Sequence, residues 1–228
     1  MEPYNKKEAV HNKTILTSRK GHAHAVMIPV DDVVEVLKEK FIAFDVETTG
    51  LNPVTDRIVE IGTVLFMDGK PVDSFCTLVN PKQRISQAAS AVNQITNDML
   101  KTAPLEEDVY PSLANFFDEA MDGNTILCAH NAKFDFGFLC NTFSRLGYDA
   151  NIRYVDTLSL SRKYVKELWN YRLNTVAKSF GLINSNAHRA DSDAEICGTI
   201  LCKLLDLIDG TKKDQRRSPA TRKVSRLD

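Results

Sequence analysis

The chain is organised around one stretch, Phe41-Ile42-Ala43-Phe44-Asp45-Val46-Glu47-Thr48-Thr49-Gly50. Four apolar residues followed by Val46 predict a strand that is buried on both faces and that ends in a Thr-Thr-Gly turn. Because side chains alternate across a strand, Asp45 and Glu47 point to the same face at its carboxyl end. Two carboxylates beside an apolar core repel each other unless a cation neutralises them, and a divalent metal ion is the simplest candidate. An isolated D-x-E also ends strands without any such role, so the rest of the chain must decide.

Length and composition favour one globular domain with tails. The chain has 228 residues with 43% hydrophobic content, enough for one sizeable core. It shows no repeat with a period of about 20–50 residues and no run of about 18 apolar residues, so neither a repeat array nor a membrane span is expected. The N-terminus has no apolar segment typical of a secretory signal. The five cysteines of the chain lack C-x-x-C spacing. A cytoplasmic protein with buried thiols and no membrane partner is therefore expected.

Three parts are predicted along the chain. Residues 1–40 form an N-terminal extension, loosely packed over 1–30 and with a short helix near 31–39; residues 41–209 form the domain. Residues 210–228 form a basic tail without apolar periodicity, which is expected to be disordered. Residues 211–228 have a net charge of +5, so the rest of the chain has −6. The tail either has no role, captures phosphates or docks on a partner.

A mixed α/β sheet with helices on both faces is predicted for the domain. The Asp68-Gly69 hairpin signal makes the strands at 58–67 and 72–79 antiparallel, so three consecutive strands form a meander. Downstream, helical patterns alternate with short strands near 125–129 and 153–155, which implies helix-connected strands in the same sheet. Ligands of such sheets gather at the carboxyl ends of the central strands, where Asp45 and Glu47 lie. The expected helices lie within 86–100, 105–121, 134–146, 173–180 and 191–208.

Two further polar clusters lie at predicted helix starts. In His130-Asn131-Ala132-Lys133-Phe134-Asp135 a strand ends and a helix begins, which places Asp135 in the first helical turn, where the helix dipole favours a carboxylate. In His188-Arg189-Ala190-Asp191-Ser192-Asp193 a polar loop enters the last helix. Taken alone, each cluster is equally consistent with an acid that caps a helix.

Taken together and in this order, the three stretches resemble the DEDD family of 3′→5′ exonucleases, in its histidine subclass. The shared pattern is F-D-x-E-T-T-G, then H-N-A-x-F-D, then H-R-A-x-x-D-A, and the resemblance covers about residues 40–207. It is strongest to the proofreading exonucleases of bacterial DNA polymerase III, either the epsilon subunit or the exonuclease domain of the Gram-positive polymerase. The tyrosine subclass has a Tyr four residues before the last Asp. This chain has Arg189 there and His188 five residues before Asp193.

The resemblance implies a ribonuclease-H-like fold and a two-metal site. The implied ligands of two divalent ions, Mg²⁺ or Mn²⁺, are Asp45, Glu47, Asp135 and Asp193, with His188 as general base. These residue types suit the chemistry, because carboxylates are hard oxygen ligands and histidine titrates near neutrality. The candidate substrate contacts are Thr48, Thr49, Leu51, His130 and Asn131.

Other residues near the motifs have simpler interpretations. Leu51 is also consistent with a loop leucine that covers the core. Phe134 and Phe138, four residues apart on a predicted helix, are expected in the core rather than under a base. Structural roles are expected for Glu60 and Asp156, the latter as a helix cap.

The activity implied is metal-dependent release of nucleoside monophosphates from single-stranded 3′ ends, most consistent with DNA in proofreading or repair. A DNA polymerase subunit is then a candidate partner. Trimming of RNA 3′ ends stays open, because no residue settles the sugar. An inactive nuclease fold kept as a binding module is the alternative of a different class. The four carboxylates argue against it, since a retired site has no physical reason to keep them together.

Overall fold

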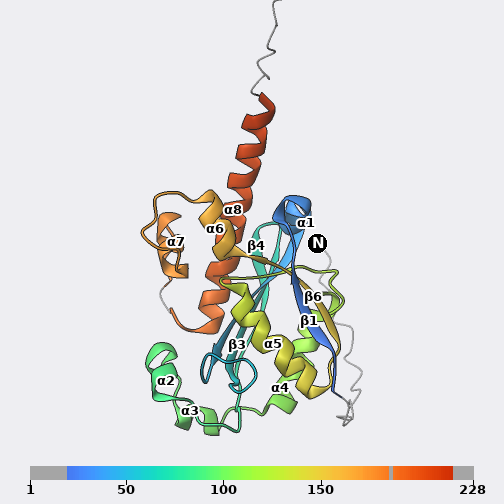
Figure 1. Ribbon diagram of the computed structural model, residues 1–228, viewed down its shortest axis with the longest axis vertical. Helices are drawn as coiled ribbons and strands as arrows, with labels where there is room; N and C mark the ends of the chain where they lie inside the picture. Colours follow the sequence, from blue (N-terminus) through green and yellow to red (C-terminus); the bar gives the residue numbers. More distant parts are fainter. Residues whose placement is uncertain (1–19, 185–186, 218–228) are drawn as a thin grey trace, which may run out of the picture.

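A six-stranded mixed sheet lies at the centre of the computed structural model, which describes residues 20–184 and 187–217 (Figure 1). The strand order is β1-β6-β5-β2-β3-β4, with β2 antiparallel to β3 and parallel to β5. The meander followed by helix-connected strands confirms the predicted fold class. The strands are β1 (Ala23–Met27), β2 (Lys40–Thr48), β3 (Ile58–Met67), β4 (Lys70–Leu78), β5 (Leu127–Ala129) and β6 (Ala150–Asp156).

Helices cover both faces of the sheet (Figure 1). Alternate residues of β2 pack into two hydrophobic cores, one on each face of the sheet. Phe41 and Ala43 pack with α8, whereas Ile42 and Phe44 pack with α4 and α5. Because the alternation continues, Asp45 leaves the sheet on the α8 side. The helical elements are η1 (Val30–Asp32), α1 (Val34–Glu39), α2 (Gln87–Asn93), α3 (Asn97–Lys101), α4 (Glu106–Phe117), η2 (Asp118–Ala120), α5 (Ala132–Leu146), α6 (Thr157–Tyr164), α7 (Leu173–Ser179) and α8 (Ala190–Arg217).

The predicted hairpin between β3 and β4 is confirmed. Asp68 and Gly69 have φ of 51° and 72°, both in the left-handed region that a tight two-residue hairpin turn requires. The register of β2 on β3 pairs Asp45 with Gly62 and Glu47 with Glu60. The carboxylate of Glu60 on β3 therefore lies beside the acidic end of β2.

The segment before β2 is part of the fold, which corrects the sequence interpretation. β1 pairs in parallel with β6, from Ala23 opposite Ala150 to Met27 opposite Tyr154. The expectation that residues 1–30 are loosely packed is therefore wrong for β1. This edge strand exposes several of its five residues, so the sequence shows no clear apolar alternation. Residues 1–19 lie outside the described residues.

The last helix is longer than predicted. α8 continues to Arg217, so residues 211–217, which were expected to be disordered, are helical. Figure 1 shows this end of α8 extending beyond the sheet. Lys, Gln and Arg have high helix propensity and continue a helix without a core beside them. Residues 218–228 lie outside the described part of the chain. Within the described ranges, no helix combines the length and hydropathy needed to cross a bilayer.

Gly62 allows β3 to touch the beginning of α8. A Cβ on Gly62 would lie 2.1 Å from the backbone of Ala190, so Gly62→Ala is expected to push α8 from the sheet and lower the free energy of unfolding by about 1–3 kcal/mol. Gly137 on α5 is a matched control, because a Cβ there meets nothing closer than Pro53 at 3.7 Å. Gly137→Ala is expected to be neutral or to stabilise by about 0.5–1 kcal/mol. Urea unfolding measures both, and equal stabilities would contradict the close approach.

Candidate active site

β2 and α5 bring the first two motifs together. Asp135 lies in the first turn of α5 and is buried, and its carboxylate accepts a hydrogen bond from the backbone N–H of Val46 at 3.3 Å. Phe44 and Phe136 stack beside this contact with their ring centroids 5.6 Å apart. Packing therefore fixes Asp135 against the end of β2, next to Asp45.

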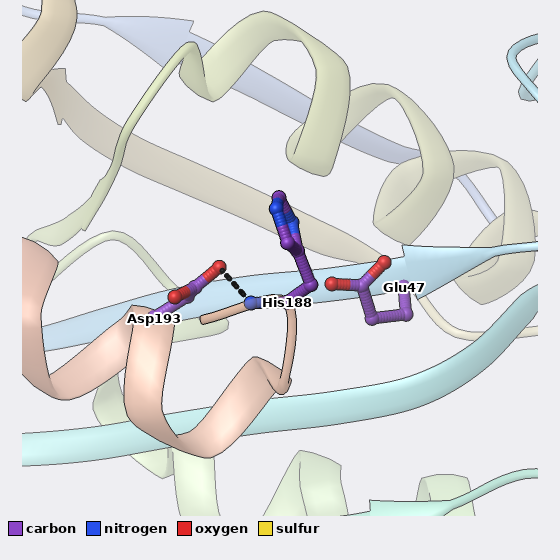
Figure 2. Close-up of side chains that lie close together, drawn as sticks. All are labelled: Glu47, His188 and Asp193. Carbon is purple, nitrogen blue, oxygen red and sulfur yellow. Dashed lines mark hydrogen bonds between the residues drawn. The ribbon is translucent and has the colours of Figure 1, made fainter. Parts of the chain in front are cut away.

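α8 adds Asp193, and the loop before it adds His188. The Asp193 carboxylate accepts a hydrogen bond from the backbone N–H of His188 at 3.2 Å and another from the side-chain amide of Asn184. Asn184 also donates to Asn174 on α7. Candidate ligand atoms of Glu47, His188 and Asp193 lie within 4.8 Å of one another, with His188 between the two carboxylates (Figure 2). The structure thus brings the predicted catalytic residues into one cluster, while their roles stay a prediction.

An ion pair between the exposed Arg189 and the buried Glu60 holds the loop that carries His188. Glu60 on β3 accepts hydrogen bonds from Arg189 Nη2 at 2.6 Å and Nε at 3.0 Å, and from the backbone N–H of Ala190 at 3.0 Å. His188 has a φ of 67°, which residues other than glycine rarely adopt. Because Glu60 pairs with Glu47 across the strands, this ion pair ties the His188 loop to the acidic end of β2. Sequence reasoning expected a structural role for Glu60 but missed its partner, which is 129 residues away.

The clustered carboxylates raise one another's pKa. Burial raises the pKa of Asp45 well above its usual range, and the neighbouring Asp135 and Asp193 raise it further, although the residue keeps some exposure to solvent. Burial and the charge of Asp193 raise the pKa of Glu47 to about 8. Burial also raises the pKa of Asp135 and of Asp193, against the opposing effect of their hydrogen bonds. Without cations the cluster therefore retains protons near neutral pH.

Of the predicted substrate contacts in the turn after β2, the two threonines are buried and the leucine is exposed. The Thr48 hydroxyl donates to the carbonyl of Gly50 at 2.6 Å, and Thr49 Oγ1 accepts from the N–H of Arg57 at 3.0 Å. Both threonines are buried, so their hydroxyls hold the turn. Leu51 is 83% exposed, so the alternative that it covers the core is wrong.

A cavity of about 410 Å³ lies beside Glu47 and Leu51. Its far wall comes from α2, with Ala89 and Val92 among the lining residues, and Phe134 also faces it. Sequence reasoning expected a helix within 86–100 but did not place it at the site, because a short helix without charged residues carries no chemical signal. It expected both Phe134 and Phe138 in the core, which holds for the buried Phe138, whereas Phe134 is only partly buried.

His130 and Asn131 lie at the site but are engaged within the protein. His130 Nδ1 lies 2.9 Å from Thr157 Oγ1, and its Nε2 donates to the carbonyl of Tyr171 at 2.8 Å. Burial lowers the pKa of His130, which keeps the ring neutral. The N–H of Asn131 donates to Asp156 at 3.0 Å. Asp156 also accepts from the N–H of Leu158, so it caps α6 as predicted. Both hydrogen-bond networks fix loops around the site.

Comparison with known proteins identifies relatives of the chain. Residues 42–201 match the Exonuclease family. A DNA polymerase III of the PolC type from Oceanobacillus iheyensis is 42% identical over 169 residues, which cover 74% of this chain and 12% of that protein. The chain thus spans only about an eighth of the curated relative. Exonuclease X, solved in complex with 5′ overhanging duplex DNA, is 29% identical with a TM-score of 0.56, over 73% of this chain and 90% of that one. Exonuclease I of E. coli, solved with a dT13 oligonucleotide, is 20% identical with a TM-score of 0.64, over 78% and 43% of the two chains, and supports the fold alone.

Metal-free protein is expected to be less stable with Glu47 than with glutamine at high pH. The pKa of Glu47 is 4.5 when unperturbed and about 8 in the folded chain, so the folded state binds the extra proton between these values. The contribution of Glu47 to stability is therefore fully present below about pH 4.5 and is lost as the pH rises through 8. In EDTA, the Tm of Glu47→Gln minus that of the wild type should grow from pH 5 to pH 8.5.

The exposed Glu195 on α8 provides the control for removing one negative charge. Glu195→Gln should show no comparable growth when Tm is followed by circular dichroism over the same pH range. A Glu47→Gln difference that stays constant from pH 5 to pH 8.5 would contradict the raised pKa.

Proposed function

The chain belongs to the exonuclease family, and we propose that it removes nucleoside monophosphates from single-stranded 3′ ends of DNA by two-metal-ion hydrolysis. The observation that carries the proposal is the convergence of carboxylates from β2, α5 and α8 in one cluster, beside an exposed histidine. DNA is favoured over RNA because the relative is named as a DNA polymerase and exonuclease X was solved with DNA. A DNA polymerase portion or subunit is the partner that we propose, with proofreading as the corresponding role.

Family membership implies dependence on a divalent metal ion, and the donor set fits one. Carboxylate oxygens are the ligands that Mg²⁺ and Mn²⁺ prefer, and cations would relieve the repulsion that raises the pKa values of the cluster. We assign two ions to Asp45, Glu47, Asp135 and Asp193. The charges of the other three raise the pKa of Asp45, so all four carboxylates lie within electrostatic reach of one another at this residue. When bound, the ions would stabilise the charge that develops on the attacked phosphate and the leaving oxygen.

We assign His188 as the group that takes the proton from the attacking water. Its ring is exposed and lies within 4.8 Å of the Glu47 and Asp193 carboxylates, and imidazole accepts a proton near neutral pH. Its backbone is held by Asp193 and its neighbour Arg189 by Glu60, so the loop positions the ring relative to the carboxylates. The same proximity also favours a second candidate role for His188, that of a metal ligand.

We assign the terminal nucleotide to the cavity beside Glu47. Leu51 and Val92 are both exposed at this cavity, and such side chains can pack against the face of a base. Thr48 and Thr49 contribute by shaping the turn that presents Leu51, since their hydroxyls are already hydrogen-bonded.

Activity should require both the cations and the carboxylates. Excess EDTA is expected to stop hydrolysis, Mg²⁺ or Mn²⁺ to restore it, and Asp45→Asn or Asp193→Asn to abolish it while the fold is kept. Asp191→Asn, which changes an exposed acid two residues from Asp193, is the matched control and should retain activity. The measurement follows 5′-labelled single-stranded DNA, a mismatched primer-template and single-stranded RNA as they shorten from the 3′ end.

Three outcomes would overturn parts of this assignment. Undiminished cleavage in excess chelator would contradict the metal requirement. Faster degradation of RNA than of DNA would move the assignment to RNA trimming. Binding of DNA without cleavage in either metal would support the inactive binding module.

Removing His188 should impair the chemical step more than metal binding. His188→Ala is expected to lower kcat by roughly 10²–10⁴-fold, the usual contribution of a positioned general base, and to leave the Mn²⁺ affinity nearly unchanged. A large loss of Mn²⁺ affinity would instead assign His188 as a ligand. Wild-type turnover in His188→Ala together with loss in His130→Ala would show that the wrong histidine was assigned.

A further inference from the structure

A second cavity, of about 730 Å³, lies on the other side of the proposed catalytic residues. His188 and Asp193 line one part of it, and Arg162, Trp169 and Arg172 line another. Its volume is within the range of about 300–1,000 Å³ that is typical of ligand sites. The cavity beside Leu51 is lined by Glu47, so the two cavities flank the carboxylate cluster.

The segment 162–172, which runs from the last turn of α6 to the residue before α7, has a composition that suits a nucleic acid. It contains four basic side chains (Arg162, Lys163, Lys166 and Arg172), one acidic side chain and three aromatic ones. A basic segment beside a cluster of carboxylates offsets the repulsion that a phosphate backbone would meet there. Aromatic and arginine side chains together are typical of surfaces that bind single strands.

Trp169 is the only tryptophan of the chain, and its side chain is 86% exposed. Tryptophan is on average highly buried, because its ring carries a large apolar surface. The segment that presents it is anchored: the Tyr171 carbonyl accepts from His130 Nε2 at 2.8 Å, and the Tyr171 hydroxyl donates to the carbonyl of Val165 at 3.0 Å. The indole therefore stands at the cavity on a backbone fixed to the active site.

We propose that Trp169 stacks on a base upstream of the nucleotide that is removed, while Arg162 and Arg172 bind neighbouring phosphates. The inference rests on the proposed function, because it requires the terminal nucleotide in the cavity beside Leu51. A strand whose scissile phosphate lies at the carboxylates then continues past His188 into the second cavity. Trp169 thus contributes to substrate affinity and to the length of strand that the enzyme recognises, and not to the chemical step.

Fluorescence tests this contact separately from hydrolysis. Because the chain has a single tryptophan, its emission reports on Trp169 alone. In the full chain carrying Asp45→Asn, with Mg²⁺ present, the tetranucleotide dT4 is expected to quench the emission. Thymidine 5′-monophosphate, which has no upstream base, should leave the emission unchanged. Binding of dT4, followed independently by calorimetry, without any change in emission would overturn the inference and leave the proposed function intact. Failure of the wild type to bind or hydrolyse DNA would overturn both.

Variants of the wild type give the kinetic test. Trp169→Ala is expected to raise KM for dT4 roughly 10-fold with little change in kcat, and Trp169→Phe to restore most of the affinity. Both should hydrolyse the p-nitrophenyl ester of thymidine 5′-monophosphate at the wild-type rate, because this substrate has no upstream nucleotide. Ile183→Ala is the matched control, since Ile183 is 87% exposed but does not line the cavity.

Equal KM values for Trp169→Ala and Ile183→Ala would overturn the stacking contact. An equal loss on the nucleoside ester and on dT4 would also overturn it, because Trp169 would then support the active site as a whole. Arg162→Gln should lower the slope of log K for dT4 against log salt concentration by about 0.7, as expected for one phosphate contact on a single strand. An unchanged slope would overturn the phosphate contact.

Discussion

Mutual repulsion among four carboxylates is the constraint on which this structure depends. The repulsion is tolerated because the elements that carry the acids are fixed by apolar packing in the two cores, where Phe41 stacks on Phe66 and Phe44 on Phe136. Burial of each such side chain contributes about 1.5–3 kcal/mol, so the many apolar side chains of the two cores together offset the electrostatic cost of the raised pKa values. The site is thus strained electrostatically while the fold is not, and binding of cations would release the strain.

The register of the sheet also determines how the loop that carries His188 is held. Glu60 lies opposite Glu47 and forms the ion pair with Arg189, so one pair of strands positions both a proposed metal ligand and the loop of the proposed base. Glu60 raises the pKa of Glu47 whereas Arg189 lowers it, so the two members of the pair have opposite effects on the proposed ligand. Gly62 lies two residues after Glu60 on β3, on the same face of the sheet. It lets α8 approach the sheet closely enough to bring Asp193 to the site.

The sequence predicted the fold class, the meander and the family because their signals are local. A double-faced apolar strand, a two-residue hairpin and three short motifs can each be recognised within about ten residues. What it missed depends on contacts between distant segments. β1 is an edge strand without alternation, the Glu60–Arg189 pair joins residues 129 apart, and Trp169 becomes a candidate only because the structure exposes it at a cavity beside His188. The helical extension of α8 was hidden by a composition that is typical of both tails and solvated helices.

The central claim is that the carboxylates share protons until cations replace them. Its most direct test is a calorimetric titration of the metal-free chain with Mn²⁺ at pH 7, in two buffers with different enthalpies of ionisation. The account predicts saturable binding of two ions per chain with net release of protons, because the raised pKa values keep the free cluster partly protonated. Absence of saturable binding, or binding without proton release, would contradict it.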